Sequence, residues 1–247
     1  MSNIKFRSNL DTGLRNSFLE VTVVSAKRAG SYNVATRGNL LDAAEHLFAE
    51  RGYEAVTLKE IAEVASANVG QIVYHFGQKD ELIKEVVLRR AGLISDERLQ
   101  LLDSYERLVG LNKVELEPVV RAFLDPYFAK LKSDDPGWRC YALFIGRNVW
   151  DAKLSQAISE GFNPTAHRYI EAIRRAVPTL TKVDGARAFQ FLLAGLYGST
   201  TNDSRINGLL GDDSLSADYD GYQEILIPYV VGGIKSIGDM RAAAAWA

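Results

Sequence analysis

Apolar residues recur along this chain at intervals of three and four, which is the spacing of amphipathic α-helices. The first such segment begins near Thr36. It is expected to end at Arg51-Gly52, because glycine readily takes the left-handed conformation that follows a helix C-terminus. Five apolar residues share its inner face: Leu40, Leu41, Ala44, Leu47 and Phe48. The pattern therefore predicts a first helix over residues 36–51.

Two further short helices are predicted between residues 57 and 76. Thr57 stands just before an apolar stripe, and Glu60 comes three residues after Thr57. This spacing is the pattern of a capping box. Asn68 can cap the next helix. The inner residues are Leu58, Ile61, Ala62 and Ala65 in the second helix and Val69, Ile72, Val73 and Phe76 in the third. A short turn joins the two helices, so the spacing is that of a helix-turn-helix.

The third predicted helix presents polar and aromatic side chains on its outer face. Five residues face outward: Asn68, Gly70, Gln71, Tyr74 and His75. Glutamine pairs with adenine in the major groove, tyrosine and histidine reach phosphates or base edges, and glycine lets the backbone approach closely. Periodicity alone does not separate this DNA-reading interpretation from a small helical subdomain with incidental polar residues.

Charge restricts where DNA could bind. The formal net charge of the 247 residues is −2, which argues against a protein that coats nucleic acid or membranes non-specifically. Residues 36–82 contain four basic and eight acidic residues, a net charge of −4. A DNA-binding face must therefore be built locally from three cations and two positive helix N-termini. These are Arg37, Lys59, Lys79, Thr57 and Asn68.

Residues 1–35 are predicted to be a basic, flexible N-terminal extension. They are rich in Ser, Asn, Thr and Gly and hold five basic and two acidic residues, a net charge of +3. An alternative is a basic arm that contacts phosphate, and a third is a start codon placed too early.

The segment TRGNLLDAAEHLFAERGYEAVTLKEIAEVASANVGQIVYHFGQKDELIKEVV resembles the DNA-binding domain of the tetracycline-repressor (TetR) family of bacterial regulators. The matching positions are Ala43-Ala44, Leu47-Phe48, Gly52-Tyr53, Thr57, Ile61-Ala62, Gly70, Tyr74-His75-Phe76 and Lys79-Asp80-Glu81-Leu82. Ser66-Ala67 departs from the usual Gly-Val of the turn, and Gly77-Gln78 from the usual Pro-Ser. Val69 stands where the family often has a polar residue, so it is expected to meet a thymine methyl.

The resemblance and the outward residues together define a candidate DNA-binding set within a helix-turn-helix domain over residues 36–82. This set is Arg37, Thr57, Lys59, Asn68, Val69, Gly70, Gln71, Tyr74, His75 and Lys79. The implied partner is double-stranded operator DNA, bound by a homodimer.

The rest of the chain is predicted to be an all-helical domain over residues 83–240 that binds an effector and dimerises. Periodic apolar segments cover about 80–108, 115–132, 137–149, 152–176, 184–200 and 222–238. Residues 115–235 resemble, more weakly, the ligand-binding domain of a TetR subgroup. Some members of that subgroup respond to fatty acyl or aromatic compounds. The resemblance therefore implies an effector pocket.

Aromatic residues are dense between residues 123 and 169, with a few polar side chains among them. Any one of these aromatic residues is explained by packing in the core. As a group, with polar side chains among them, they indicate an apolar cavity with polar anchors. Arg147 is the candidate to meet an acidic ligand group, with a structural salt bridge as the alternative. The candidate ligand set is Phe123, Tyr127, Trp138, Tyr141, Phe144, Arg147, Asn148, Trp150 and Phe162.

Two C-terminal segments are apolar on nearly every side and are predicted to pair across a homodimer as a four-helix interface. The candidate interface residues are Phe189, Leu192, Leu193, Leu196, Tyr197, Ile225, Tyr229, Val230 and Ile234. The segment around Pro228 is rich in β-branched residues, so a buried strand is an alternative to a helix there. The resemblance favours the helix.

An enzyme is the competing class of protein. The chain lacks the glycine-rich, P-loop, HExxH and GxSxG motifs, and its three histidines show no metal-ligand spacing, so no metal or cofactor is expected. It has a single cysteine and no apolar run near the roughly 20 residues of a membrane span, which favours the cytoplasm. The sequence thus predicts a DNA-binding regulator, most simply a repressor released by a small apolar, aromatic or acyl effector. A helical ligand-binding protein without a regulatory role is the alternative.

Overall fold

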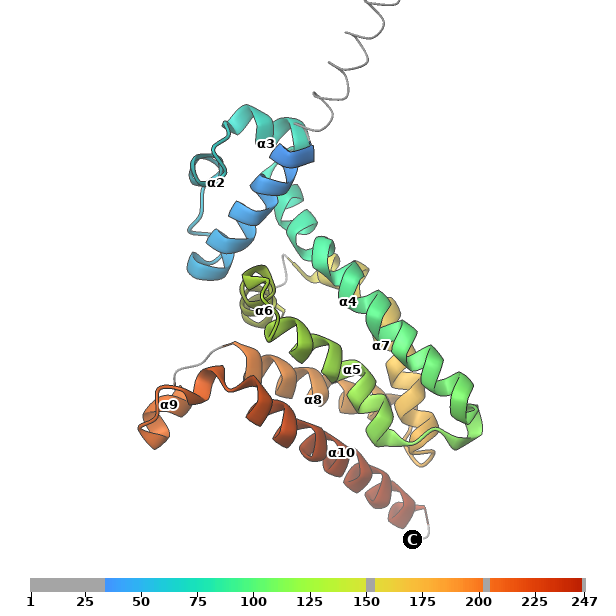
Figure 1. Ribbon diagram of the computed structural model, residues 1–247. Helices are drawn as coiled ribbons and strands as arrows, with labels where there is room; N and C mark the ends of the chain where they lie inside the picture. Colours follow the sequence, from blue (N-terminus) through green and yellow to red (C-terminus); the bar gives the residue numbers. More distant parts are fainter. Residues whose placement is uncertain (1–33, 150–153, 202–204, 246–247) are drawn as a thin grey trace, which may run out of the picture.

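The computed structural model describes residues 34–149, 154–201 and 205–245, and every regular element in these ranges is a helix. The predicted all-α fold is confirmed. The candidate ligand residue Trp150 and nearly all of the N-terminal extension lie outside the described residues. Figure 1 shows a group of short helices at one end, from which one long helix runs into a larger helical bundle.

One longer and two short helices form the N-terminal unit: residues 34–51, α2 (Leu58–Val64) and α3 (Val69–Phe76). Both predicted caps are present, since the side chains of Thr57 and Asn68 each accept a hydrogen bond from the backbone N–H three residues on. Gly52 has a φ of 79°, as expected of the residue that ends the first helix. The spacing and caps therefore produced the predicted helix-turn-helix.

The turn between α2 and α3 contains a strained residue. Ser66 has a φ of 52°, the only positive φ among the described residues other than glycines. The turn is closed by backbone hydrogen bonds from Ser66 to Glu63 and from Ala67 to Ala62, at 3.1 and 2.8 Å. A left-handed conformation brings Cβ close to the backbone in any residue except glycine. The departure noted at Ser66 thus has a conformational cost in the turn that places α3.

The C-terminal part consists of longer helices that match the predicted periodic segments closely. They are α4 (Lys79–Val109), α5 (Leu116–Leu131), α6 (Pro136–Asn148), α7 (Ser155–Ala176), α8 (Lys182–Thr200) and α10 (Tyr219–Ala244). Three short elements were not predicted, namely the 3-10 helices η1 (Leu111–Lys113) and η2 (Leu215–Ala217) and the helix α9 (Arg205–Leu210). Pro228 lies inside α10, which is continuous over 26 residues, so the strand alternative for this segment is wrong.

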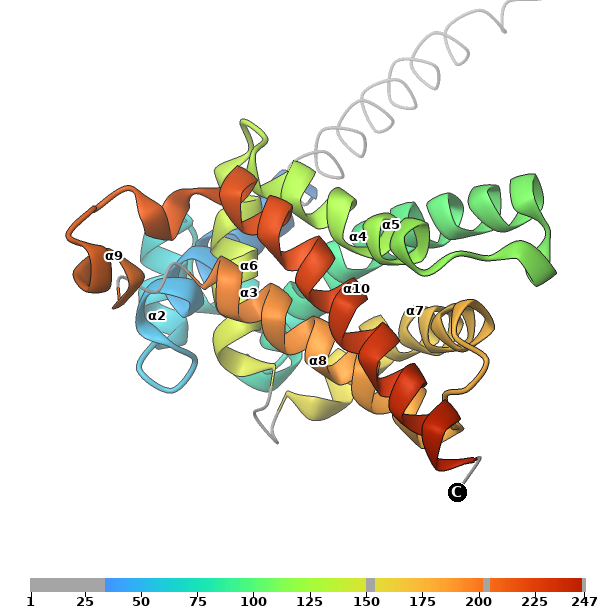
Figure 2. The ribbon, with the colours of Figure 1, turned by 90° about the horizontal axis from the view of Figure 1, so that it is seen from below.

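The helical bundle is organised around α4 and α5. Helix α4 packs against α7 and α5, while α10 packs against α5 and α8. Figure 2 shows α8 and α10 side by side on one outer face of the bundle. No described helix combines the length and the apolar composition that a membrane-spanning segment needs. The core therefore lies between α4, α5, α7 and α8, with α10 as an outer layer.

Candidate DNA-binding surface and effector cavity

The outer face of α3 carries apolar as well as polar side chains. Tyr74 is 74% exposed, and two valines that were predicted to be internal, Val69 and Val73, are 39% and 55% exposed. Only Ile72 and Phe76 of the predicted inner stripe are buried. The prediction was wrong for the valines because this short helix packs against its neighbours only through Ile72 and Phe76, which are four residues apart. The valines lie to the side of that line. Val73 is thus a surface residue that the sequence argument missed, and its methyl groups suit a thymine methyl.

Gln71 is half-buried and caps its own helix. Its Oε1 accepts a hydrogen bond from the Asn68 backbone N–H at 3.0 Å, and Asn68 Oδ1 accepts one from the Gln71 N–H at 3.0 Å. Gly70 leaves room for this cap, since a Cβ there would lie 3.1 Å from Asn68 Oδ1. A two-bond contact with adenine uses the same Oε1. Because an amide oxygen has two lone pairs, Oε1 could accept from adenine as well as from Asn68, so the capping box restricts the orientation of Gln71 without excluding base reading.

The N-terminus of α2 already holds its own negative charge. The Thr57 hydroxyl and backbone N–H both donate to Glu60 Oε2, at 2.7 and 2.8 Å, and Arg51 lies 2.8 Å from the other oxygen. The hydrogen bond from Thr57 is the main cause that lowers the pKa of Glu60 to about 2. A phosphate at Thr57 would therefore meet a permanent carboxylate. Lys59, which is 80% exposed, is the better placed contact on α2.

Two of the predicted phosphate contacts are held against the protein. Lys79 donates to the Tyr53 carbonyl and lies 4.2 Å from the centre of the Tyr53 ring. Arg37 pairs with Glu85 at 2.5 Å and lies 5.0 Å from the centre of the Phe76 ring. Their role in binding phosphate stays a prediction, and it requires that each ammonium or guanidinium group leave these partners first.

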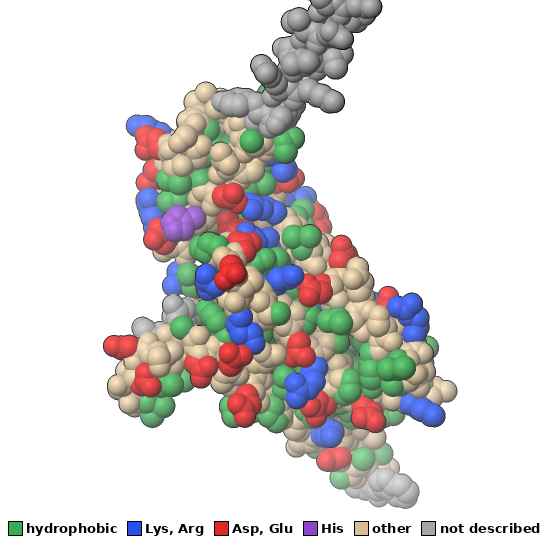
Figure 3. Space-filling model, viewed as in Figure 1, with side chains coloured by type: hydrophobic (Ala, Val, Ile, Leu, Met, Phe, Trp, Pro, Cys, Tyr) green, Lys and Arg blue, Asp and Glu red, His purple; other side chains and the backbone are tan. Residues whose placement is uncertain are grey.

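The remaining candidate, His75, is half-buried at the end of α3 with its ring edge-on to Tyr74, the ring centres 5.0 Å apart. Figure 3 shows basic and acidic side chains interleaved over the visible face rather than gathered into one basic field. Such a surface gives little non-specific attraction to DNA. Binding would depend on the shape and side chains of α3.

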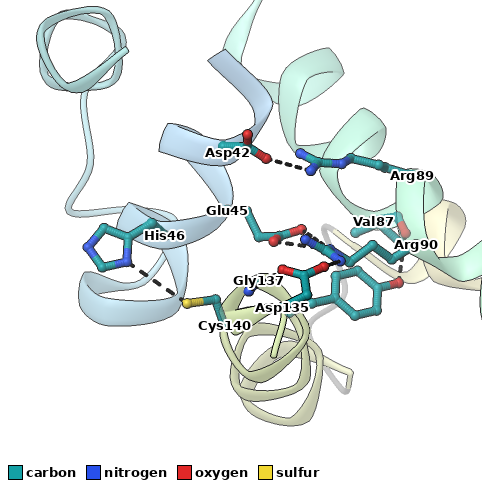
Figure 4. A network of polar contacts seen from close by, with 10 residues as sticks. Asp42, Glu45, His46, Val87, Arg89, Arg90, Asp135, Gly137 and Cys140 are labelled. Atoms are coloured by element: carbon teal, nitrogen blue, oxygen red, sulfur yellow. Dashed lines mark hydrogen bonds and ion pairs between the residues drawn. The ribbon is translucent and has the colours of Figure 1, made fainter. Parts of the chain in front are cut away.

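A buried ion-pair network joins the N-terminal unit to the bundle (Figure 4). Arg90 of α4 donates through Nε to both carboxylate oxygens of Glu45, at 3.1 and 2.9 Å, and through Nη1 to Asp135 at 2.9 Å. Glu45 lies in the first helix and Asp135 caps α6, so one guanidinium connects three helices. The side chains of Arg90 and Glu45 are 7% and 2% exposed. Burial raises the pKa of Glu45 although Arg90 opposes it.

Gly137 is required for this network. A Cβ at Gly137 would lie 2.0 Å from an Arg90 guanidinium nitrogen, so no other residue fits without displacing Arg90. Nearby, Cys140 Sγ lies 3.9 Å from His46 Nδ1, which adds a weak contact between α6 and the first helix. The sequence argument missed this network, because residues 45, 90 and 135 lie far apart along the chain.

Several predicted ligand residues belong to the same interface. Arg147 donates to the Ala49 carbonyl at 2.9 Å, and Tyr141 donates to the Val87 carbonyl at 2.8 Å. Phe144 is fully buried and its ring lies 6.2 Å from that of Phe48. These side chains hold α6 against the first helix and α4. Tyr141 and Phe144 are core residues rather than the lining of a cavity, and Arg147 is an exposed residue that bonds to the end of the first helix.

A different set of residues lines a cavity of about 250 Å³ between α4, α5, α7 and α8. Of the predicted residues, Phe123 and Phe162 line it, whereas the buried residues Tyr127 and Trp138 and the half-buried Asn148 do not. Arg98 of α4 also lines it and is 3% exposed. Its Nε donates to the Phe123 carbonyl at 2.8 Å, while its Nη2 has no hydrogen-bond partner among the described residues. The sequence argument missed Arg98, because a single arginine in a long amphipathic helix gives no signal of burial.

The predicted dimer residues divide into two groups. Ile225 and Tyr229 of α10 are 68% and 75% exposed. Leu193 is half-buried, and six others are buried in their own protomer: Phe189, Leu192, Leu196, Tyr197, Val230 and Ile234. They are corrected to core residues, because α10 covers the side of α8 that was assigned to a partner. Phe191, which is 64% exposed on α8, was missed.

Comparisons with known protein families match both parts of the chain. Residues 40–86 match the family described as "Bacterial regulatory proteins, tetR family". Residues 121–233 match "Tetracyclin repressor-like, C-terminal domain".

Two curated relatives have similar sequences. The HTH-type transcriptional repressor KstR2 of Mycobacterium tuberculosis is 34% identical over 152 residues, which cover 54% of this chain and 72% of KstR2. The probable acrEF/envCD operon repressor of Escherichia coli is 30% identical over 157 residues, which cover 59% of this chain and 64% of the relative.

Two solved structures share the fold. The SmeT–triclosan complex has a TM-score of 0.55 and 23% identity, covering 81% of this chain and 91% of SmeT. SmeT is the repressor of the SmeDEF multidrug efflux pump of Stenotrophomonas maltophilia. The fatty acid degradation regulator FadR of Bacillus halodurans has a TM-score of 0.54 and 18% identity, covering 78% of this chain and 94% of FadR. At these identities the structures establish the common fold.

Proposed function

Because the chain belongs to the tetR family of bacterial transcriptional regulators, we propose that it represses transcription as a homodimer on operator DNA and is released by a small effector. The KstR2 and E. coli relatives are named as repressors, which supports a regulator rather than an enzyme. Action on bacterial operator DNA places the protein in the cytoplasm. The effector cavity, rather than the domain interface, is where the small molecule is proposed to bind.

The observation that carries this proposal is the continuity of α4. Helix α3 ends at Phe76, and after Gly77 and Gln78 the helix α4 begins at Lys79. It continues without interruption past Arg98. At 1.5 Å per residue the segment between Lys79 and Arg98 is about 28 Å long. The cavity and the recognition helix are therefore attached to one rigid element, and any shift of α4 at the cavity is transmitted to α3.

The polar network determines how such a shift reaches the other N-terminal helices. Arg90 holds the first helix and α6 to α4, and Arg147 attaches α6 to the end of the first helix. Movement of α4 or α6 therefore carries the whole N-terminal unit as a body. A ligand changes DNA affinity only by its difference in affinity for the two arrangements, and a coupling of about 1–3 kcal/mol changes it roughly 5–150-fold.

We assign the dimer interface to the exposed face of α8 and α10. Phe191, Ile225 and Tyr229 are all more than 60% exposed there, which is a large apolar surface for a monomer. A Cβ on Gly232 or Gly233 would meet nothing within 4 Å, so a partner helix has space to approach α10. Two recognition helices related by a two-fold axis would read half-sites about 34–36 Å apart, or a multiple of that.

A gel shift with DNA from upstream of the chain's own gene tests the proposal. We expect a complex that forms at nanomolar to micromolar protein, survives competition by scrambled DNA and contains a protein dimer. Equal affinity for operator and scrambled DNA would leave a helical ligand-binding protein as the better description.

A further inference from the structure

We propose that the α4–α5–α7–α8 cavity binds a compact carboxylate, an aryl or branched alkyl acid whose anion pairs with Arg98. The proposal rests on the proposed function, since it names the class of effector for the same cavity. The sequence argument had placed an acid-binding arginine at Arg147, which the structure assigns to the Ala49 carbonyl.

Arg98 is a buried cation without an anion. Its guanidinium has one described hydrogen bond, from Nε to the Phe123 carbonyl, and lies 3.7 Å from the centre of the Phe123 ring. No Asp or Glu among the described residues forms an ion pair with it, and Nη2 is buried without a partner. A guanidinium has five N–H donors, and a buried charge is costly unless it is paired. Among the described residues no group pairs with this charge, and the anion of a ligand in the cavity would supply one.

The cavity has a buried end around Arg98 and an opening to the surface. Arg98, Phe123, Phe189 and Tyr197 line it and are buried. Other lining residues are exposed and mark where the cavity opens to the surface, namely Asn163, His167, Ala186 and Gln190. The buried end thus combines one cation with aromatic side chains. An amphipathic acid that enters with its carboxylate first would satisfy both.

The volume and the charge limit the ligand further. The cavity measures about 250 Å³, and an apolar cavity of roughly 150 Å³ is known to hold benzene. There is space inside for one ring with a short acid side chain, whereas a long acyl chain would have to extend through the opening to the surface. A phosphate dianion would bring a second negative charge that a single arginine leaves unpaired. The monoanion of a carboxylic acid matches the one cation available.

Binding of 3-phenylpropanoate, phenylacetate and benzoate to the full chain tests the proposal, with 3-phenylpropanamide as the neutral counterpart. We expect calorimetry and thermal shift to show binding of at least one carboxylate and no binding of the amide. Arg98→Met should weaken the carboxylate about tenfold to a hundredfold, the usual range for a lost hydrogen bond to a charged group. Arg107→Met, on the exposed end of the same helix, is the matched control and should leave binding unchanged.

A second variant, Ala166→Leu, fills the cavity but leaves Arg98 in place, and it should abolish binding of the carboxylate. This variant tests the proposal even if Arg98→Met does not fold. The proposal is overturned if no carboxylate of the set binds, if the amide binds as well as the acid, or if Arg98→Met binds the acid normally. Operator gel shifts on the same protein separate the two proposals. A chain that binds its operator but no carboxylate refutes only this inference, whereas a carboxylate bound through Arg98 without DNA binding refutes only the regulator.

Discussion

Replacing Arg90 by methionine should destabilise the protein by about 3–5 kcal/mol at pH 8, because it leaves Glu45 buried without its partner. The estimate follows from the geometry. Glu45 is 2% exposed and receives two hydrogen bonds from Arg90 Nε, whereas Asp135 is half-exposed and can return to water. The adjacent Arg89→Met is the matched control. Arg89 pairs with Asp42, whose side chain is 62% exposed, so this change should cost less than about 1 kcal/mol.

The dependence on pH identifies Glu45 as the cause. Burial raises the pKa of Glu45 above its ordinary value of 4.5, and Arg90 opposes that rise. Without Arg90 the folded-state pKa rises further. A carboxyl group with a higher pKa in the folded chain favours folding below its unfolded pKa, and this contribution is lost as the pH rises through the folded pKa. The defect of Arg90→Met should therefore be smaller at pH 5 than at pH 8.

Urea unfolding of the full chain at both pH values measures these differences, with Glu45→Gln/Arg90→Met as the decisive variant. Removing both charges should recover most of the stability, because the buried anion is then absent. The reasoning is refuted if the double variant is as unstable as Arg90→Met, or if the loss in Arg90→Met is the same at pH 5 and pH 8. The recovered double variant also permits a functional test, since it should bind operator DNA but respond less to the effector.

Three further predictions concern the turn, the recognition helix and the dimer. Ser66→Gly should stabilise the chain by about 0.5–1 kcal/mol in thermal unfolding, because glycine adopts the positive φ without the strain of a Cβ; no gain would show that Ser66 is unstrained. Gln71→Ala and Gln71→Glu should both lower the ratio of operator to scrambled-DNA affinity, although glutamate retains the capping box; an unchanged ratio in both would restrict Gln71 to capping. Phe191→Asp should convert the dimer to a monomer in analytical ultracentrifugation and abolish operator binding, while a persistent dimer would move the interface away from α8.

The sequence predicted the secondary structure well because the signals are local. The hydroxyl of Thr57 with Glu60, the amide of Asn68 and the glycine at position 52 are caps that depend on a few neighbouring residues. Their positions define the ends of the N-terminal helices without reference to any tertiary contact. The longer helices followed in the same way from the spacing of their apolar residues.

The candidate sites were predicted less well because they depend on which helix covers which face. Periodicity placed Val73 inside and gave no sign that α10 would bury Leu192 and Leu196 within one protomer. The partner of a charge is also a tertiary property. Arg147 and Arg98 are both arginines in amphipathic helices, yet the first meets a backbone carbonyl and the second an aromatic cavity.

Two buried arginines on α4 have opposite roles in this arrangement. Arg90 and Arg98 are about two helical turns, or roughly 12 Å, apart. Arg90 is paired with Glu45 and Asp135, so it fixes the position of the N-terminal unit on α4. Arg98 has no such partner, so the helix around it is the part that a bound anion can reposition. Because a single helix carries both, we expect a shift of α4 at Arg98 to reach α3 through the helix itself and the first helix through Arg90. If a carboxylate binds at Arg98 as proposed, the two sites should be energetically coupled through α4, so that ligand and operator DNA weaken each other's binding by the same factor.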